Sequence, residues 1–174
     1  MAAIKKMKRY STQELKNIYK QDDIINKINN IEKVESSVCR SKFKILIIND
    51  NVNMANQTKR LIKSETDFDN VFTTNSLYEA KDLLSKLEIS LVLTCYRMGT
   101  GDEDCYDLFK YINKKHKHTS MIMISGVNTE TERMNLKKAG VPVLGSRVDA
   151  EILANIVQCA YVKFLDKELD QCLQ

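Results

Sequence analysis

Apolar residues recur along most of the chain in two alternating patterns. Short, nearly continuous apolar runs are typical of strands buried on both faces of a parallel sheet. Segments with an apolar residue every three or four positions indicate amphipathic helices. The predicted strands are Phe43–Asn49, Asn70–Thr74, Ile89–Cys95, Ser120–Ser125 and Val141–Leu144. The predicted helices are Met54–Glu65, Leu77–Leu87, Asp104–Asn113, Thr129–Ala139 and Ala150 to about Leu169.

Strands and helices that alternate in this way predict an α/β fold, a doubly wound five-stranded parallel sheet with helices on both faces. In the flavodoxin-like strand order 2-1-3-4-5, the topological switch lies between the first and third strands, and a ligand or reacting group sits at their carboxyl ends. Those ends carry Asn49, Asp50 and Cys95. No glycine-rich loop follows the first strand, so a mononucleotide cradle is not expected.

The residues before the first strand predict a helical extension. We expect a basic helical extension and linker over residues 1–42 and a main domain with an extended last helix over residues 43–174. Ser11 and Glu14 match a capping box. An apolar stripe follows at Leu15, Ile18, Ile25 and Ile28. Such a stripe is buried on its own domain, on a second copy or on a partner, and the sequence leaves these three open. Residues 35–42 are expected to form a linker.

Charge is distributed unevenly between the two parts. Residues 1–42 hold 10 Lys or Arg and 5 Asp or Glu, whereas residues 43–174 hold 17 and 18. A basic extension can attract nucleic acid, but a main domain with a balance of −1 is not expected to bind it.

The composition argues against several other classes of protein. Five cysteines without a CxxC pair, together with only two histidines, indicate reduced thiols and not a disulfide framework or a zinc site. No apolar run is long enough to span a bilayer. We therefore expect a cytoplasmic protein without a cofactor.

Three motifs occur in order and in register. They are the Leu77–Leu84 segment LYEAKDLL, the Tyr106–Ile112 segment YDLFKYI, and a step of fourteen residues from Ser125 to Ala139. Because of these three motifs, the segment Phe43–Phe164 resembles a CheY-like receiver domain of two-component response regulators. The resemblance implies an acyl phosphate formed on an aspartate that ends the third strand. It also implies a magnesium ion held by an acidic pair after the first strand, and a hydroxyl and a lysine that contact the phosphoryl oxygens.

The acidic residues implied by the resemblance are largely missing here. The acidic pair corresponds to Asn49 and Asp50, so one carboxylate is lost and Asp50 is the residual metal candidate. The acceptor position, three residues before a methionine, corresponds to Cys95. A thiol does not substitute for a carboxylate in aspartyl-phosphate transfer.

The remaining positions of the implied pocket are partly kept. Ser125 retains the hydroxyl, and Arg147 retains the positive charge of the lysine with a different shape. Leu144 replaces the aromatic switch residue. In one interpretation Arg147 pairs with Asp50 and fixes the pocket in one state. In another, Cys95 is a redox or acylation sensor whose thiol pKa is lowered by Arg147 and raised by Asp50.

These departures predict a degenerate receiver, a pseudo-receiver that acts without phosphorylation as a protein–protein interaction module in signal transduction or regulation, and not as an enzyme. Its partners would bind the face formed by the fourth helix, fifth strand and last helix, or the N-terminal helix, and a homodimer is one candidate assembly. One alternative is a DNA-associated transcriptional regulator that uses the basic N-terminus. Another is an atypical response regulator that is still phosphorylated.

Overall fold

The computed structural model describes residues 37–95, 105–124, 134, 136–145 and 148–172. Five parallel strands form one sheet in the order β2-β1-β3-β4-β5. This α/β topology confirms the predicted doubly wound fold. The strands are β1 (Ile45–Ile48), β2 (Val71–Thr74), β3 (Leu91–Thr94), β4 (Ser120–Ile124) and β5 (Val143–Leu144). The extension up to residue 36 and most of the predicted helix Thr129–Ala139 lie outside the described residues.

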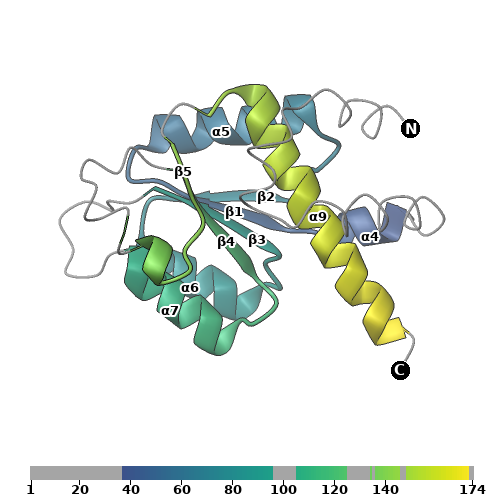
Figure 1. Ribbon diagram of the computed structural model, residues 1–174. Helices are drawn as coiled ribbons and strands as arrows, with labels where there is room; N and C mark the ends of the chain where they lie inside the picture. Colours follow the sequence, from purple (N-terminus) through teal and green to yellow (C-terminus); the bar gives the residue numbers. More distant parts are fainter. Residues whose placement is uncertain (1–36, 96–104, 125–133, 135, 146–147, 173–174) are drawn as a thin grey trace.

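Helices cover both faces of this sheet. On one face lie α5 (Val52–Glu65) and α9 (Ala150–Cys172), and on the other lie α6 (Leu77–Lys86) and α7 (Cys105–Lys115) (Figure 1). α9 ends at Cys172, a few residues past the predicted end at about Leu169. None of the helices in the described part of the chain has the length and apolarity that a bilayer crossing requires.

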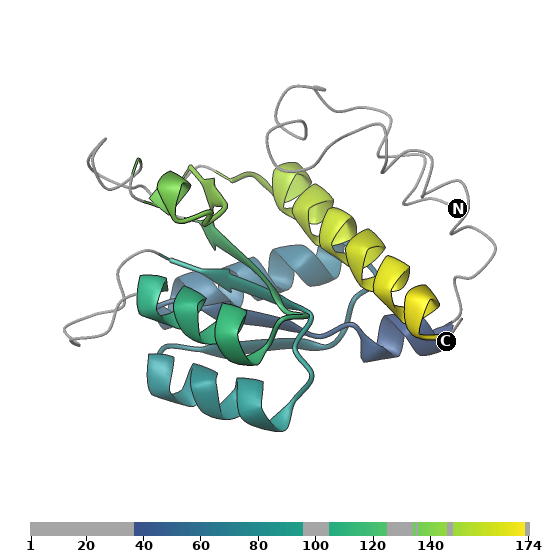
Figure 2. The ribbon, with the colours of Figure 1, turned by 60° about the horizontal axis from the view of Figure 1, so that its bottom comes forward.

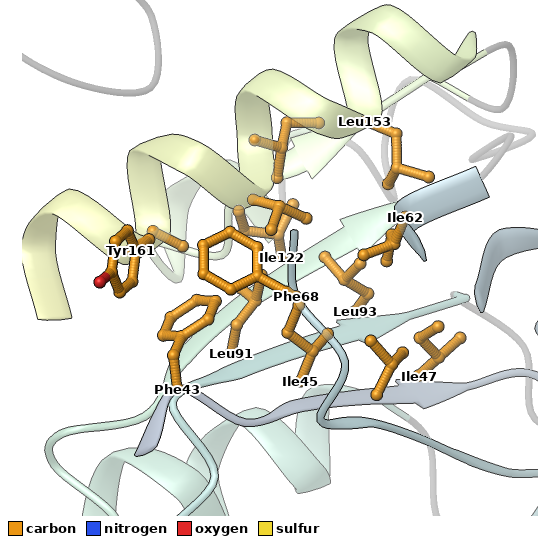
Figure 3. Packing of buried hydrophobic residues seen from close by; sticks show 14 of the residues in the cluster. Phe43, Ile45, Ile47, Ile62, Phe68, Leu91, Leu93, Ile122, Leu153 and Tyr161 are labelled. Carbon is orange, nitrogen blue, oxygen red and sulfur yellow. The ribbon is translucent and has the colours of Figure 1, made fainter. Parts of the chain in front are cut away.

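The strands divide their side chains between two apolar clusters, because successive residues of a strand point to opposite faces of the sheet. Ile45 and Ile47 of β1 join the cluster beneath α5 and α9, which Figure 3 shows from close by. Leu46 and Ile48 join the cluster on the α6 and α7 side. All four residues of β1 are buried, which explains why the strand has a continuous apolar sequence.

Polar side chains cap the N-termini of α5 and α9 at the carboxyl edge of the sheet. The Asn51 side chain accepts hydrogen bonds from the backbone N–H groups of Asn53 and Met54 at the start of α5. Asp149 Oδ1 accepts from the Ile152 N–H, 2.8 Å away, at the start of α9. Both caps satisfy backbone donors that have no partner within the helix, and the Asn51 cap also orders the loop that follows β1.

A short helix replaces the predicted linker. Ser37–Lys42 forms α4, and the prediction of a linker was wrong for these six residues. The Arg40 guanidinium carbon lies 5.8 Å from the centre of the Phe68 ring and 5.9 Å from that of Tyr161. Lys42 forms an ion pair of 3.2 Å with Glu168 of α9. α4 therefore lies beside the C-terminal half of α9 (Figure 2), where it covers one end of the apolar cluster.

Two methionines of the described residues are exposed to solvent. Met54 and Met134 each expose 49% of their surface. In α5, which begins two residues earlier than predicted, Ala55 takes the inward position beside Met54. Met121 and Met123 of β4 are buried. A strand between two helical layers buries both faces, whereas a helix buries only one.

Candidate functional site

The carboxyl ends of β1 and β3 lie next to each other. Ile48 is the register partner of Thr94, and the Cys95 N–H donates a hydrogen bond of 3.2 Å to the Ile48 carbonyl. The next residues of both strands therefore leave the sheet at one edge. This geometry brings Asn49, Asp50 and Cys95 together.

Asp50 and Cys95 are in direct contact. The Cys95 Sγ lies 3.8 Å from Asp50 Oδ1, with the thiol as donor. Burial raises the pKa of the Cys95 thiol, and the Asp50 carboxylate raises this pKa further, while a hydrogen bond from the Asp50 backbone opposes the change. The thiol is therefore held in its neutral form at neutral pH. A neutral thiol is a weak nucleophile, and because Arg147 lies outside the described residues, the sensing interpretation stays a prediction.

Asn49 turns its side chain into its own loop. Its Oδ1 accepts a hydrogen bond of 2.9 Å from the Asn51 N–H, which is an Asx turn. Asn51 in turn caps α5. The amide oxygen of Asn49 thus orders the loop after β1, which occupies one of its two acceptor positions.

The described residues at this edge do not fit a magnesium ion. Magnesium requires near-octahedral oxygen ligands and usually one or two carboxylates. Asp50 supplies one carboxylate, the Asn49 oxygen is engaged in its loop, and the soft sulfur of Cys95 is a poor ligand for magnesium. Within the described ranges, no three His, Cys, Asp or Glu side chains are grouped so that they could hold a metal ion.

The other predicted pocket residues are only partly described. Leu144 of β5 pairs with Ile124 of β4 and packs, half-buried, against the apolar cluster under α5 and α9. An aliphatic side chain anchored in this way has no ring to rotate. Ser125 and Arg147 lie outside the described residues, so the Asp50–Arg147 ion pair stays a prediction.

A second concave site lies at the opposite, amino-terminal edge of the sheet. It is a cavity of about 730 Å³, formed by the connections before β3 and β4 together with α4 and α9. Its most frequent lining residue is lysine, at positions Lys42, Lys86, Lys114, Lys115, Lys117 and Lys167. Sequence reasoning missed this site, although the run Lys114–His118 was a visible signal. We call it the basic groove.

Comparisons with known proteins agree with this geometry. The family model described as the response regulator receiver domain matches residues 45–158. No curated protein matches the chain. The chain is similar to the response regulator receiver domain protein from Clostridium thermocellum, with 23% identity and a TM-score of 0.62 over 73% of this chain and 98% of that one.

Two further solved structures share the fold at low identity. The beryllofluoride-activated NtrC4 receiver domain dimer has 16% identity and a TM-score of 0.61 over 70% of this chain and 98% of that one. The adenylate cyclase from Rhodopirellula baltica has 19% identity and a TM-score of 0.64 over 75% and 96%. At these identities the likeness shows the fold alone.

Proposed function

Because the chain belongs to the response regulator receiver family, we propose that it is a pseudo-receiver, a signalling module that binds a protein partner without being phosphorylated and without enzymatic activity. The observation that carries this proposal is the contact of 3.8 Å between Cys95 Sγ and Asp50 Oδ1, at the strand end where the family places its acceptor aspartate.

The chemistry of this contact argues against phosphoryl transfer. An acyl phosphate forms when a carboxylate oxygen attacks phosphorus, and Cys95 presents a neutral thiol instead. A phosphoryl group would also bring a charge of about −1.5 to −2 beside the Asp50 carboxylate. Magnesium would normally offset this repulsion, but the described residues of the pocket do not fit that ion.

The same geometry favours a single conformational state. The loop after β1 is held by the Asn49–Asn51 and Asn51–Asn53 hydrogen bonds, and Leu144 is packed against the core. The protein is therefore a permanently available binding module. Its partner binds the face that includes β5 and α9, or the N-terminal extension, and a second copy of the chain is one candidate partner.

Incubation of the full chain with acetyl phosphate and magnesium, followed by intact-mass measurement, tests the proposal. We expect no adduct, while a receiver domain that retains its acceptor aspartate gains one phosphoryl group under the same conditions. The variant Asn49→Asp/Cys95→Asp restores the missing carboxylates and is the matched control. A phosphoryl adduct on the natural chain would overturn the proposal.

A further inference from the structure

The basic groove collects charge from distant parts of the chain. Of the 17 Lys and Arg residues in the main domain, five line the groove, but only two of the 18 Asp and Glu residues do so. These two are Glu88 and Glu168. The groove therefore contributes +3 to the main domain, and the rest of the domain contributes −4. Lys42, which precedes the main domain, adds a further positive charge to the wall of the groove.

Helix termini explain only part of this concentration. Lys42, Lys86, Lys114 and Lys115 lie in the last turns of α4, α6 and α7, where cations stabilise the negative end of the helix dipole. Three helix ends contribute only about −0.5 charge each, which is less than the surplus of lysines.

Two lysines of the groove have no such explanation. Lys117 follows α7, and Lys167 lies within α9. Their presence on the groove wall is therefore not a consequence of helix capping.

Four of the lysines are available to a ligand. Lys42 pairs with Glu168, and Lys86 pairs with Asp82 at 2.7 Å. For the other four, no carboxylate among the described residues lies within ion-pair distance. These four are Lys114, Lys115, Lys117 and Lys167.

We propose that the basic groove binds single-stranded nucleic acid through its phosphodiester backbone. Lysine is depleted in protein–protein interfaces, whereas protein–nucleic acid interfaces are much more positively charged. The groove lining contains no arginine, so the bidentate contacts that read guanine are absent from it. Binding through the groove is therefore independent of sequence. It does not depend on the proposed pseudo-receiver function, because the groove and the Asp50–Cys95 contact lie at opposite edges of the sheet.

The shape of the groove favours a single strand over a duplex. A concave cavity of about 730 Å³ accepts a flexible strand, whereas a duplex is stiff over about 150 base pairs. His118, exposed on the groove lining next to Lys117, offers a ring on which a base can stack.

Fluorescence anisotropy of the full chain with a labelled, unstructured single-stranded oligonucleotide tests the proposal. Four phosphate contacts predict that the logarithm of the binding constant falls with the logarithm of salt concentration with a slope of about −3. Affinity should then fall about 50-fold between about 50 and about 200 mM salt. RNA and DNA probes are compared directly, because both carry the phosphodiester that the lysines bind.

The variant Lys114→Gln/Lys115→Gln/Lys117→Gln removes three of the four contacts. We expect its slope to drop to about −0.7 and its affinity to fall about 100-fold at about 0.1 M salt. The single variant Lys117→Gln should reduce the magnitude of the salt-dependence slope by about 0.7. This variant tests the same proposal if the triple variant does not fold.

Two control variants carry the same loss of charge elsewhere. Arg60→Gln/Lys137→Gln/Lys138→Gln changes exposed residues outside the groove and should bind like the natural chain. Lys5→Gln/Lys6→Gln/Lys8→Gln tests the basic tip of the extension and should keep most of the affinity.

Equal losses in the groove variant and in the first control would overturn the proposal. So would loss of binding only in the extension variant. Equally tight binding of a polyglutamate peptide would also overturn it, because the groove would then suit an acidic protein.

Discussion

Replacing Arg40 by alanine tests whether α4 is part of the folded domain. The guanidinium carbon lies within 6 Å of the ring centres of Phe68 and Tyr161, and each such contact contributes about 0.5–1 kcal/mol at a partly exposed site. Arg40 also pairs with Asp67 at 3.1 Å, but the Asp67 side chain is 79% exposed, so this pair adds less than about 1 kcal/mol.

We therefore expect Arg40→Ala to lower the free energy of unfolding by about 1–2 kcal/mol, since one cation shared by two rings does not give fully additive contacts. For a chain of this size the melting temperature should fall by about 3–6 °C. Urea unfolding of the full chain, followed by circular dichroism, measures the change.

Matched variants separate the contributions. Lys63→Ala removes an exposed ion pair with Asp69, of 3.3 Å, without any ring contact, and should cost less than about 0.5 kcal/mol. Arg40→Lys keeps the charge but loses the planar stacking surface, so its cost should be intermediate. A double-mutant cycle of Arg40→Ala with Asp67→Asn isolates the ion pair.

If Arg40→Ala and Lys63→Ala have equal effects on stability, α4 is not docked on the aromatic rings and the linker interpretation is restored. The result also bears on the basic groove, because α4 places Lys42 on its wall. An undocked α4 would remove that lysine and its ion pair with Glu168.

Three further predictions concern the core and the thiols. Ile62→Ala, at a fully buried position in α5, should cost about 2–5 kcal/mol in urea unfolding, whereas Val52→Ala on the exposed side of the same helix should cost less than about 1 kcal/mol. Cys95 should react with iodoacetamide more slowly than an unfolded-chain thiol because its pKa is raised. Asp50→Asn should speed the reaction by removing the neighbouring charge. A rate equal to that of the unfolded chain would contradict the burial of the Cys95 thiol. Burial raises the pKa of Cys159 to about 11, so the folded state disfavours its thiolate, and stability should fall between about pH 9 and about pH 11 by up to about 1.4 kcal/mol per pH unit. Cys159→Ala should remove this part of the pH dependence, and an unchanged profile would count against it.

The sheet was predictable from the sequence because it is covered on both faces. Every residue of β1 and β3 is buried. β1 is therefore apolar throughout and β3 is apolar up to Thr94, a pattern that differs from the periodic stripe of an amphipathic helix. The ends of the strands were less predictable. Phe43 is fully buried but precedes β1, since its ring packs against Phe68 and Tyr161 while its backbone lies outside the sheet. Burial alone does not distinguish a strand from its flank.

α4 was not predictable, because a helix of six residues is too short to show a periodic apolar stripe. Its position depends on tertiary contacts of Arg40 with rings that lie 28 and 121 residues further along the chain. The candidate pocket shows the same limit. The spacing of the strands indicated that Asp50 and Cys95 converge. The Asn49–Asn51 hydrogen bond that engages the Asn49 oxygen was not predictable, because it depends on side-chain conformation within a loop.

The basic groove shows why a net charge is a weak guide to binding. The balance of −1 over residues 43–174 predicts no nucleic-acid binding by the main domain. Parallel strands, however, gather all the connections that precede them at one edge of the sheet. The segments before β3 and β4 carry Lys86 and the Lys114–Lys117 run, and α9 brings Lys167 to the same edge. Salt screens exposed charges over a Debye length of about 10 Å, so a ligand responds mainly to the charges nearest to it and not to the net charge of the domain. A domain of nearly neutral composition can therefore present a positive surface.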